Sequence, residues 1–383
     1  MRLAPSALLG VLTLAAAAAS PDRVGAQRSR TVAPAQRGSN ATAAPVSEFV
    51  AQLADPDPAV RAAAATSLAA RRRSISDSVL AATVVPALAT ALERETDRSA
   101  QAAELRLIGD IGSASAAGAR AVRPALPAAI SRWRQEMMRA EVEPPARTTL
   151  VRLGPAGTPE VTDAVRDVLA EQCATRPSRG MLSYPGGTDV VRRAFGVTPC
   201  TEAMLVLGAA GQAAPDESAA LAAPYLSLGG ADNVVAVAAA RALAGFGEPG
   251  ARALLAAARD RSNPDRAERG VIGLAHVLTP AAVDALTEVL RDTPEDARPS
   301  AGLSRGARLR LRAAMTLGRF GAPLATPALP ALAAVANGAG PTPLRAAALT
   351  TLRAVRAGRG LPRDQPQLED VGTFEPVGAV RTR

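Results

Sequence analysis

The chain has 383 residues, enough on length alone for two or three globular domains. Hydrophobic residues make up 48% of it, but aromatic residues only 2%, so a core must be built from many small side chains. This composition excludes aromatic cages and base-stacking platforms, and it disfavours strand-rich folds, which use β-branched and aromatic residues.

The formal net charge of +9 is typical of proteins that bind polyanions. The sequence contains no lysine, so this charge comes from arginine, and the abundance of Ala, Gly and Pro indicates a compositional bias behind part of it. The lack of lysine excludes a P-loop lysine, a Schiff base and a Ser-Lys dyad. A single histidine, His276, excludes a multi-histidine metal site. We therefore expect no enzymatic activity and no metal.

The first residues have the pattern of an export signal. Arg2 supplies a positive charge, the apolar stretch 7–19 follows, and residues 24–26 (VGA) fit a small-x-small cleavage site, with 17–19 as an alternative. The apolar stretch is shorter than the roughly 20 residues of a membrane-spanning helix. We expect residues 1–26 to be a cleaved signal peptide and the mature protein to be periplasmic or extracellular, without a transmembrane anchor. An Ala-rich first helix of the fold is the alternative interpretation.

A pattern with one large apolar anchor repeats along the chain. The anchors are 31 to 57 residues apart, and a small residue lies four positions before seven of the eight. Positions i and i+4 share one face of a helix, and a small residue there lets a neighbouring helix approach closely. The anchors are Leu68, Ile108, Leu150, Leu207, Leu243, Leu274, Leu317 and Leu352.

A second apolar segment lies between successive anchors and begins with proline, as at 86–88 and 124–126. Proline fits the first turn of a helix and fits a strand interior poorly, so each repeat is predicted to be two helices joined by a turn. Such pairs must stack to bury their apolar faces. The sequence thus predicts an all-α fold: an α-solenoid of about eight helical hairpins over 46–357, between a flexible linker (27–45) and an extended or disordered tail (358–383).

The clearest repeat, residues 53–61 (LADPDPAVR) with the anchor Leu68, resembles the HEAT-repeat family. It is most similar to the short bacterial HEAT-like units also found in phycobilisome-lyase relatives. The resemblance implies a binding scaffold. It also implies a ladder between units, formed by an aspartate in the turn and an arginine early in the second helix, which match Asp55 and Arg61. Later repeats carry Ser304 and Ala339 where the aspartate would stand.

The longest interval between anchors contains the only two cysteines, Cys173 and Cys200. In an exported protein this pair predicts a disulfide that closes the irregular insertion 173–200. A redox-active pair is the alternative, although the Cys-x-x-Cys spacing is absent. The insertion is either a binding loop or a bridged linker. Its candidate partner-binding residues are Tyr184, Arg192, Arg193 and Phe195.

Residues 245–250 (GFGEPG) match the dinucleotide-binding fingerprint G-x-G-x-x-G. That site requires a strand before the glycines, whereas residues 234–244 have the Ala-rich helical pattern of the repeats. We expect a helix end followed by a turn, and no cofactor.

Together these features favour a non-enzymatic scaffold that binds a protein or peptide on the concave surface lined by the second helices. The alternative is a solenoid that binds a polyanion, nucleic acid or an acidic polymer, through its arginines. The export signal argues against nucleic acid. The identity of the partner and the oligomeric state do not follow from the sequence.

The export signal and the disulfide can be tested together by measuring the intact mass of the protein after expression in an export-competent bacterium. We expect the loss of about the first 26 residues and no alkylation of either cysteine before reduction. A full-length chain with two free thiols would contradict both expectations.

Overall fold

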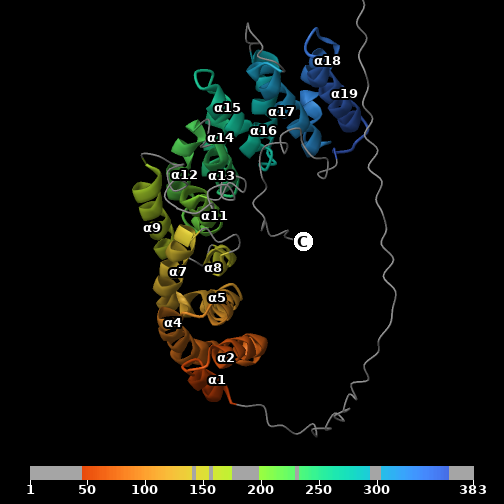
Figure 1. The fold of residues 1–383 in the computed structure, drawn as a ribbon. Coiled ribbons are helices and arrows are strands. Elements are labelled where there is room, and N and C mark those ends of the chain that lie inside the picture. The colour runs from red at the N-terminus through yellow and green to blue at the C-terminus, as the bar shows by residue number, and fades with distance from the viewer. Residues whose placement is uncertain are drawn as a thin grey trace, which may run out of the picture. The chain divides into compact units, whose positions relative to one another are not determined.

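The computed structural model describes residues 45–139, 144–154, 158–174, 198–228, 233–293 and 303–361 (Figure 1). The chain divides into two units, 1–43 and 44–383, and all described residues belong to the second. Every regular element among them is helical. The predicted signal peptide, the linker up to residue 44 and the tail from residue 362 lie outside the described residues.

The principal helices pair into eight hairpins in chain order, which confirms the predicted solenoid of helical hairpins. Short helices α3 (Asp77–Val79) and α6 (Ala116–Ala121) lie in the connections. The hairpins are α1 (Val46–Gln52) with α2 (Pro58–Arg71), α4 (Val85–Arg94) with α5 (Arg98–Gly112), α7 (Leu126–Arg139) with α8 (Pro145–Leu153), α9 (Thr158–Val168) with α11 (Pro199–Ala210), α12 (Pro215–Ala222) with α13 (Asn233–Ala244), α14 (Gly247–Ala258) with α15 (Pro264–Leu274), α16 (Pro280–Asp292) with α17 (Arg305–Phe320), and α18 (Leu329–Asn337) with α19 (Thr342–Arg356).

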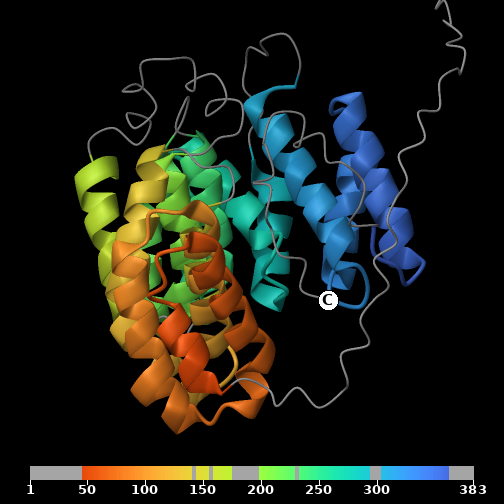
Figure 2. The same cartoon turned by 60° about the horizontal axis from the view of Figure 1, so that its bottom comes forward.

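The second helices of the hairpins pack against one another in chain order, from α2 through α5, α8, α11, α13, α15 and α17 to α19. We call them the anchor row, because each carries one of the eight anchors. In Figure 1 the labels α2, α5 and α8 follow one another on one side of the array, and α1, α4, α7 and α9 on the other. Figure 2 shows the last helices, in blue, standing side by side.

The anchors form the core of the array. All eight are buried, and seven have no exposed surface at all. The position four residues before each anchor is also packed tightly. At Gly270, an added Cβ would lie only 2.4 Å from the backbone nitrogen of Ala258 on the preceding helix. Small residues at this position therefore allow neighbouring helices to approach closely, as predicted from the sequence.

Polar residues at the turns explain where the anchor-row helices begin. The Asp57 carboxylate accepts from the backbone N–H of Ala59 at 2.8 Å and begins α2. Ser304, at the position of the missing aspartate, accepts from the N–H of Ala307 at 3.1 Å and begins α17. Such N-caps satisfy donors that the first helical turn leaves unpaired.

The glycine-rich stretch 245–250 is a turn between two helices, as expected. The helix α13 ends at Ala244 and α14 begins at Gly247, whose φ of 62° lies in the region that favours glycine. Gly250 faces the end of α13, where an added Cβ would lie 1.8 Å from the carbonyl oxygen of Leu243. The glycines therefore serve the packing of the hairpin. Among the described residues, no helix is long and apolar enough to cross a membrane.

This close approach predicts that Gly250→Ala lowers the free energy of unfolding by about 1–3 kcal/mol, since the methyl group has no room. Gly109→Ala in α5 is the matched control. Its Cβ would meet its nearest neighbour, Arg152 Cδ, at 3.4 Å, and alanine favours the helix by roughly 0.5–1 kcal/mol. Thermal melts should separate the two variants. Equal melting temperatures would contradict the role given to Gly250.

Candidate functional site

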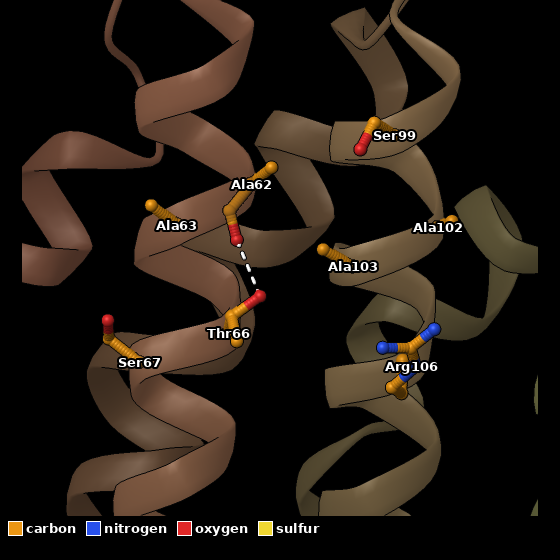
Figure 3. Close-up of a pocket in the computed structure, with 8 residues that line it drawn as sticks. All are labelled: Ala62, Ala63, Thr66, Ser67, Ser99, Ala102, Ala103 and Arg106. Carbon is orange, nitrogen blue, oxygen red and sulfur yellow. Dashed lines mark hydrogen bonds between the residues drawn. The ribbon is translucent and has the colours of Figure 1, made fainter. Parts of the chain in front are cut away.

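The candidate site is a trough on the exposed surface between adjacent helices of the anchor row. Between α2 and α5 it forms a hollow of about 450 Å³ (Figure 3). Most of its lining side chains are small, so the helix backbones themselves shape it. The lining residues are Ala62, Ala63, Thr66, Ser67, Ser99, Ala102, Ala103 and Arg106.

The trough continues from α5 to α8. A second hollow of about 260 Å³ shares Ala102 and Arg106 with the first and is completed by residues of α8, including Thr148 and Arg152. Three successive hairpins therefore present one continuous surface. A surface of this kind suits an extended segment better than a compact ligand.

Two arginines give the trough its charge. The Arg152 guanidinium pairs with the Asp110 carboxylate. Arg106, which lies on α5 and lines the hollow (Figure 3), is exposed and forms no ion pair or hydrogen bond with another described residue. The trough thus offers one uncommitted guanidinium among small side chains.

The turns beside the trough are tied together by Arg61. Its guanidinium donates to both carboxylate oxygens of Glu95, at 2.6 and 2.8 Å, and to the backbone carbonyl of Asp55 at 2.7 Å. A bidentate pair of this kind fixes geometry as well as charge. Asp55 and Arg61, the residues expected for a ladder, are therefore in contact, and the carboxylate that joins them to the next hairpin is that of Glu95.

Glu95 connects the ladder to the third hairpin. Burial alone would raise the pKa of its carboxyl, but hydrogen bonds from Arg61 and from the backbone N–H groups of Asp97 and Thr96 bring the pKa below its ordinary value. The Glu95 carbonyl accepts from Arg132 Nη2 on α7 at 2.6 Å. One chain of polar contacts thus runs through three hairpins.

Sequence reasoning missed Glu95, although a signal for it exists. Asp55 lies thirteen residues before the anchor Leu68, and Glu95 lies thirteen residues before the anchor Ile108. The resemblance to the repeat family implies aspartate at this position, whereas the second repeat carries glutamate there. A carboxylate of either length, thirteen residues before an anchor, is therefore the signal that identifies Glu95.

Glu104 is the one residue that is not small at the position four before an anchor. Its side chain is fully buried, and neither carboxylate oxygen has a hydrogen-bond partner among the described residues. Burial raises the pKa of the Glu104 carboxyl to about 8; the Glu95 carboxylate adds to the shift, and Arg61 and Arg132 oppose it. The side chain is therefore protonated at neutral pH.

The two cysteines form a disulfide in the structure. Cys173, at the end of the turn that follows α9, and Cys200, in the first turn of α11, are both buried, with their Cα atoms 5.8 Å apart. Beside them, Arg147 Nη1 donates to Glu202 Oε1 at 2.7 Å in a buried ion pair. The predicted partner-binding residues Tyr184, Arg192, Arg193 and Phe195 lie outside the described residues.

A larger hollow, of about 520 Å³, lies at the turns between the first two hairpins. Its charged lining residues are Asp55, Arg61, Arg94 and Glu95, and of these Arg61 and Glu95 pair with one another. It is also confined to one junction, whereas the trough spans two. Within the described ranges, no group of three or more His, Cys, Asp or Glu side chains could hold a metal ion.

No protein-family model matches this chain, and neither does any curated protein sequence. Among solved structures, the karyopherin Kap121p bound to the SUMO protease Ulp1p is 11% identical, with a TM-score of 0.49 over 82% of this chain and 33% of that one. Kap121p bound to Nup53p gives 11% identity and a TM-score of 0.48, again over 82% and 33%. This chain therefore spans about a third of the length of the karyopherin chains.

The complex of CpcE and CpcF of phycocyanin lyase from Nostoc sp. PCC7120 is also similar. It is 18% identical, with a TM-score of 0.33 over 85% of this chain and 98% of that one. These similarities concern the fold alone, and the predicted architecture of stacked helical hairpins is confirmed by the helix order and packing of this chain itself.

Glu104 makes the stability of the protein depend on pH. The folded state holds a proton on Glu104 up to about pH 8, whereas an unfolded chain releases it near pH 4.3. Stability therefore falls as the pH rises through this window. Glu104→Gln removes the charge, so we expect it to stabilise the protein by about 1–3 kcal/mol at pH 8 and to change little at pH 5.

Thermal melts of wild type and variant between pH 5 and pH 8.5 would measure this effect. The control is Glu248→Gln, since the Glu248 side chain is 88% exposed and only its loose pair with Arg252 is lost. It should leave the pH profile unchanged. A profile for Glu104→Gln that runs parallel to that of wild type would contradict the account.

Proposed function

We propose that the protein is an exported, non-enzymatic scaffold that binds an extended protein or peptide segment along the trough of its anchor row. The observation that carries this proposal is the continuity of the trough over α2, α5 and α8. Small side chains let the backbone of a partner approach the helices closely. Affinity then comes from contact summed over several hairpins.

The position of the trough also supports the proposal. It lies on the second helices of the hairpins, the surface that the sequence assigns to the concave side. Arg106 supplies a free guanidinium at its centre, which fits the backbone carbonyl or acidic side chain of a partner.

Binding of a polyanion is the less favoured alternative, because many described arginines already face carboxylates. Arg61 pairs with Glu95, Arg147 with Glu202 and Arg259 with Glu288. Arginines engaged in this way contribute little to the release of counterions that drives nucleic-acid binding. Binding that weakens steeply with salt would favour the polyanion.

Export is part of the proposal and has its own support. A disulfide between Cys173 and Cys200 is typical of proteins in oxidising compartments. The N-terminal pattern of charge, apolar stretch and small residues agrees with it.

The trough can be tested by photo-cross-linking in the expressing cell. We would replace Thr66, which lines the trough, with p-benzoylphenylalanine, and compare it with the same replacement at Thr90 on α4. The two positions are matched: both threonines are exposed, and each hydroxyl donates to the carbonyl four residues earlier. We expect a protein adduct from position 66 and none from position 90.

A second substitution tests whether the adduct depends on the trough. Ala102→Trp should fill the hollow from the opposite wall and reduce the adduct from position 66 at least several-fold, while circular dichroism stays unchanged. Equal adducts from both positions, or an adduct to nucleic acid, would overturn the proposal.

A further inference from the structure

Certain positions relative to the anchors line the trough in the first two hairpins. In two hairpins near the other end of the anchor row, the same positions are occupied by charged residues. Ala63 and Ala103 lie five residues before their anchors and form opposite walls of the hollow between α2 and α5. The residues five before the anchors of α15 and α17 are Arg269 and Arg312. Since α15 and α17 are also neighbours in the row, arginines occupy the equivalent positions on the two facing helices.

Two more positions in the same register also carry charged residues. Glu268 lies six residues before its anchor, as Ala62 does, and Arg308 lies nine residues before its anchor, as Ser99 does. We call Glu268, Arg269, Arg308 and Arg312 the α15/α17 cluster.

One carboxylate in this cluster is shared by two guanidinium groups. Arg312 Nε lies 2.9 Å from Glu268 Oε1, and Arg269 Nη1 lies 3.6 Å from Glu268 Oε2. Arg308 is exposed and brings a third positive charge to the surroundings of Arg269, where Asp265 is the second carboxylate. Among the described residues, three arginines here face two carboxylates, an excess of one positive charge.

The Arg269 side chain does not use all of its hydrogen-bond donors among the described residues. It is 7% exposed, and its Nε–H has no hydrogen-bond partner among the described residues. Burial lowers the pKa of Arg269, and the charges of Arg312 and Arg308 act in the same direction. A buried donor of this kind is rare in folded proteins, and an oxyanion at the cluster would balance the excess positive charge.

We propose that the α15/α17 cluster is a carboxylate-binding site that receives an aspartate or glutamate side chain of a peptide lying along the anchor row. The inference rests on the proposed function, since the peptide is the segment bound by the trough. A carboxylate matches the fork of a guanidinium and the single excess charge. A phosphate dianion would place more negative charge beside Glu268 and Asp265 than the arginines balance.

The proposal is tested by the binding of fluorescein-labelled hexaglutamate to the mature protein, followed by fluorescence anisotropy at about 0.1 M salt, where charges more than ~10 Å apart are screened. Arg308→Gln should weaken binding about fivefold or more, through loss of a charge-assisted contact. Glu268→Gln should tighten it about threefold, because the resident carboxylate no longer competes for Arg269 and Arg312. Arg308 is exposed, so its replacement leaves the core intact.

Two controls repeat these charge changes elsewhere. Arg345→Gln on α19 and Glu248→Gln on α14 alter exposed side chains outside the cluster and should each change the affinity less than twofold. If the control variants changed the affinity as much as the cluster variants, the binding would be general charge attraction, and the proposed site would be overturned. So would the absence of saturable binding.

A polyphosphate chain of equal charge distinguishes the two possible sources of oxyanion. Tighter binding of polyphosphate, with the same response to Arg308→Gln, would overturn the carboxylate assignment. Failure of the site is also distinguishable from failure of the proposed function. An adduct from position 66 that Ala102→Trp suppresses, together with hexaglutamate binding indifferent to Arg308→Gln, would overturn the site alone.

Discussion

The close contact between neighbouring helices at the position four residues before each anchor is the constraint on which the array depends. Seven of the eight anchors have a small residue at this position, which lets a neighbouring helix approach and bury the anchor. With so few aromatic residues, the core gains its apolar contact area from many such junctions rather than from a few large side chains. Small side chains also predominate on the exposed side of the anchor row between α2 and α5, and the space that they leave there is the trough.

Glu104 is the exception to the small residues found four positions before the anchors. A carboxyl group replaces the small residue, and the junction between the first two hairpins contains a buried polar group that has no hydrogen-bond partner among the described residues. Nearby, the Arg61–Glu95 pair and the contacts of Arg132 tie the turns of three hairpins together. These polar contacts therefore lie close to a junction that is weakened by a buried acid, and the cost of this burial depends on pH.

The anchors and the turn glycines could be predicted from the sequence, because a helical repeat places them at fixed spacings and each demands a particular size or backbone conformation. Glu95 and the α15/α17 cluster could not be recognised from residue type alone. Their roles depend on which helix faces them across a junction, and only the register relative to the anchors reveals that. The trough was harder still to foresee, since alanine and serine at a hollow look the same in the sequence as alanine and serine in a core.

The order of contacts along the array has a consequence for how the protein is made. Each hairpin packs on the one before it. A chain whose N-terminal part is made first can therefore add its hairpins one after another, because no hairpin needs a contact with a distant segment. The sequence between α9 and α11 is long, so the fourth hairpin closes only after α11 has been made. Oxidation of Cys173 and Cys200 then joins the two helices of this hairpin covalently, and they stay together while the remaining hairpins are added.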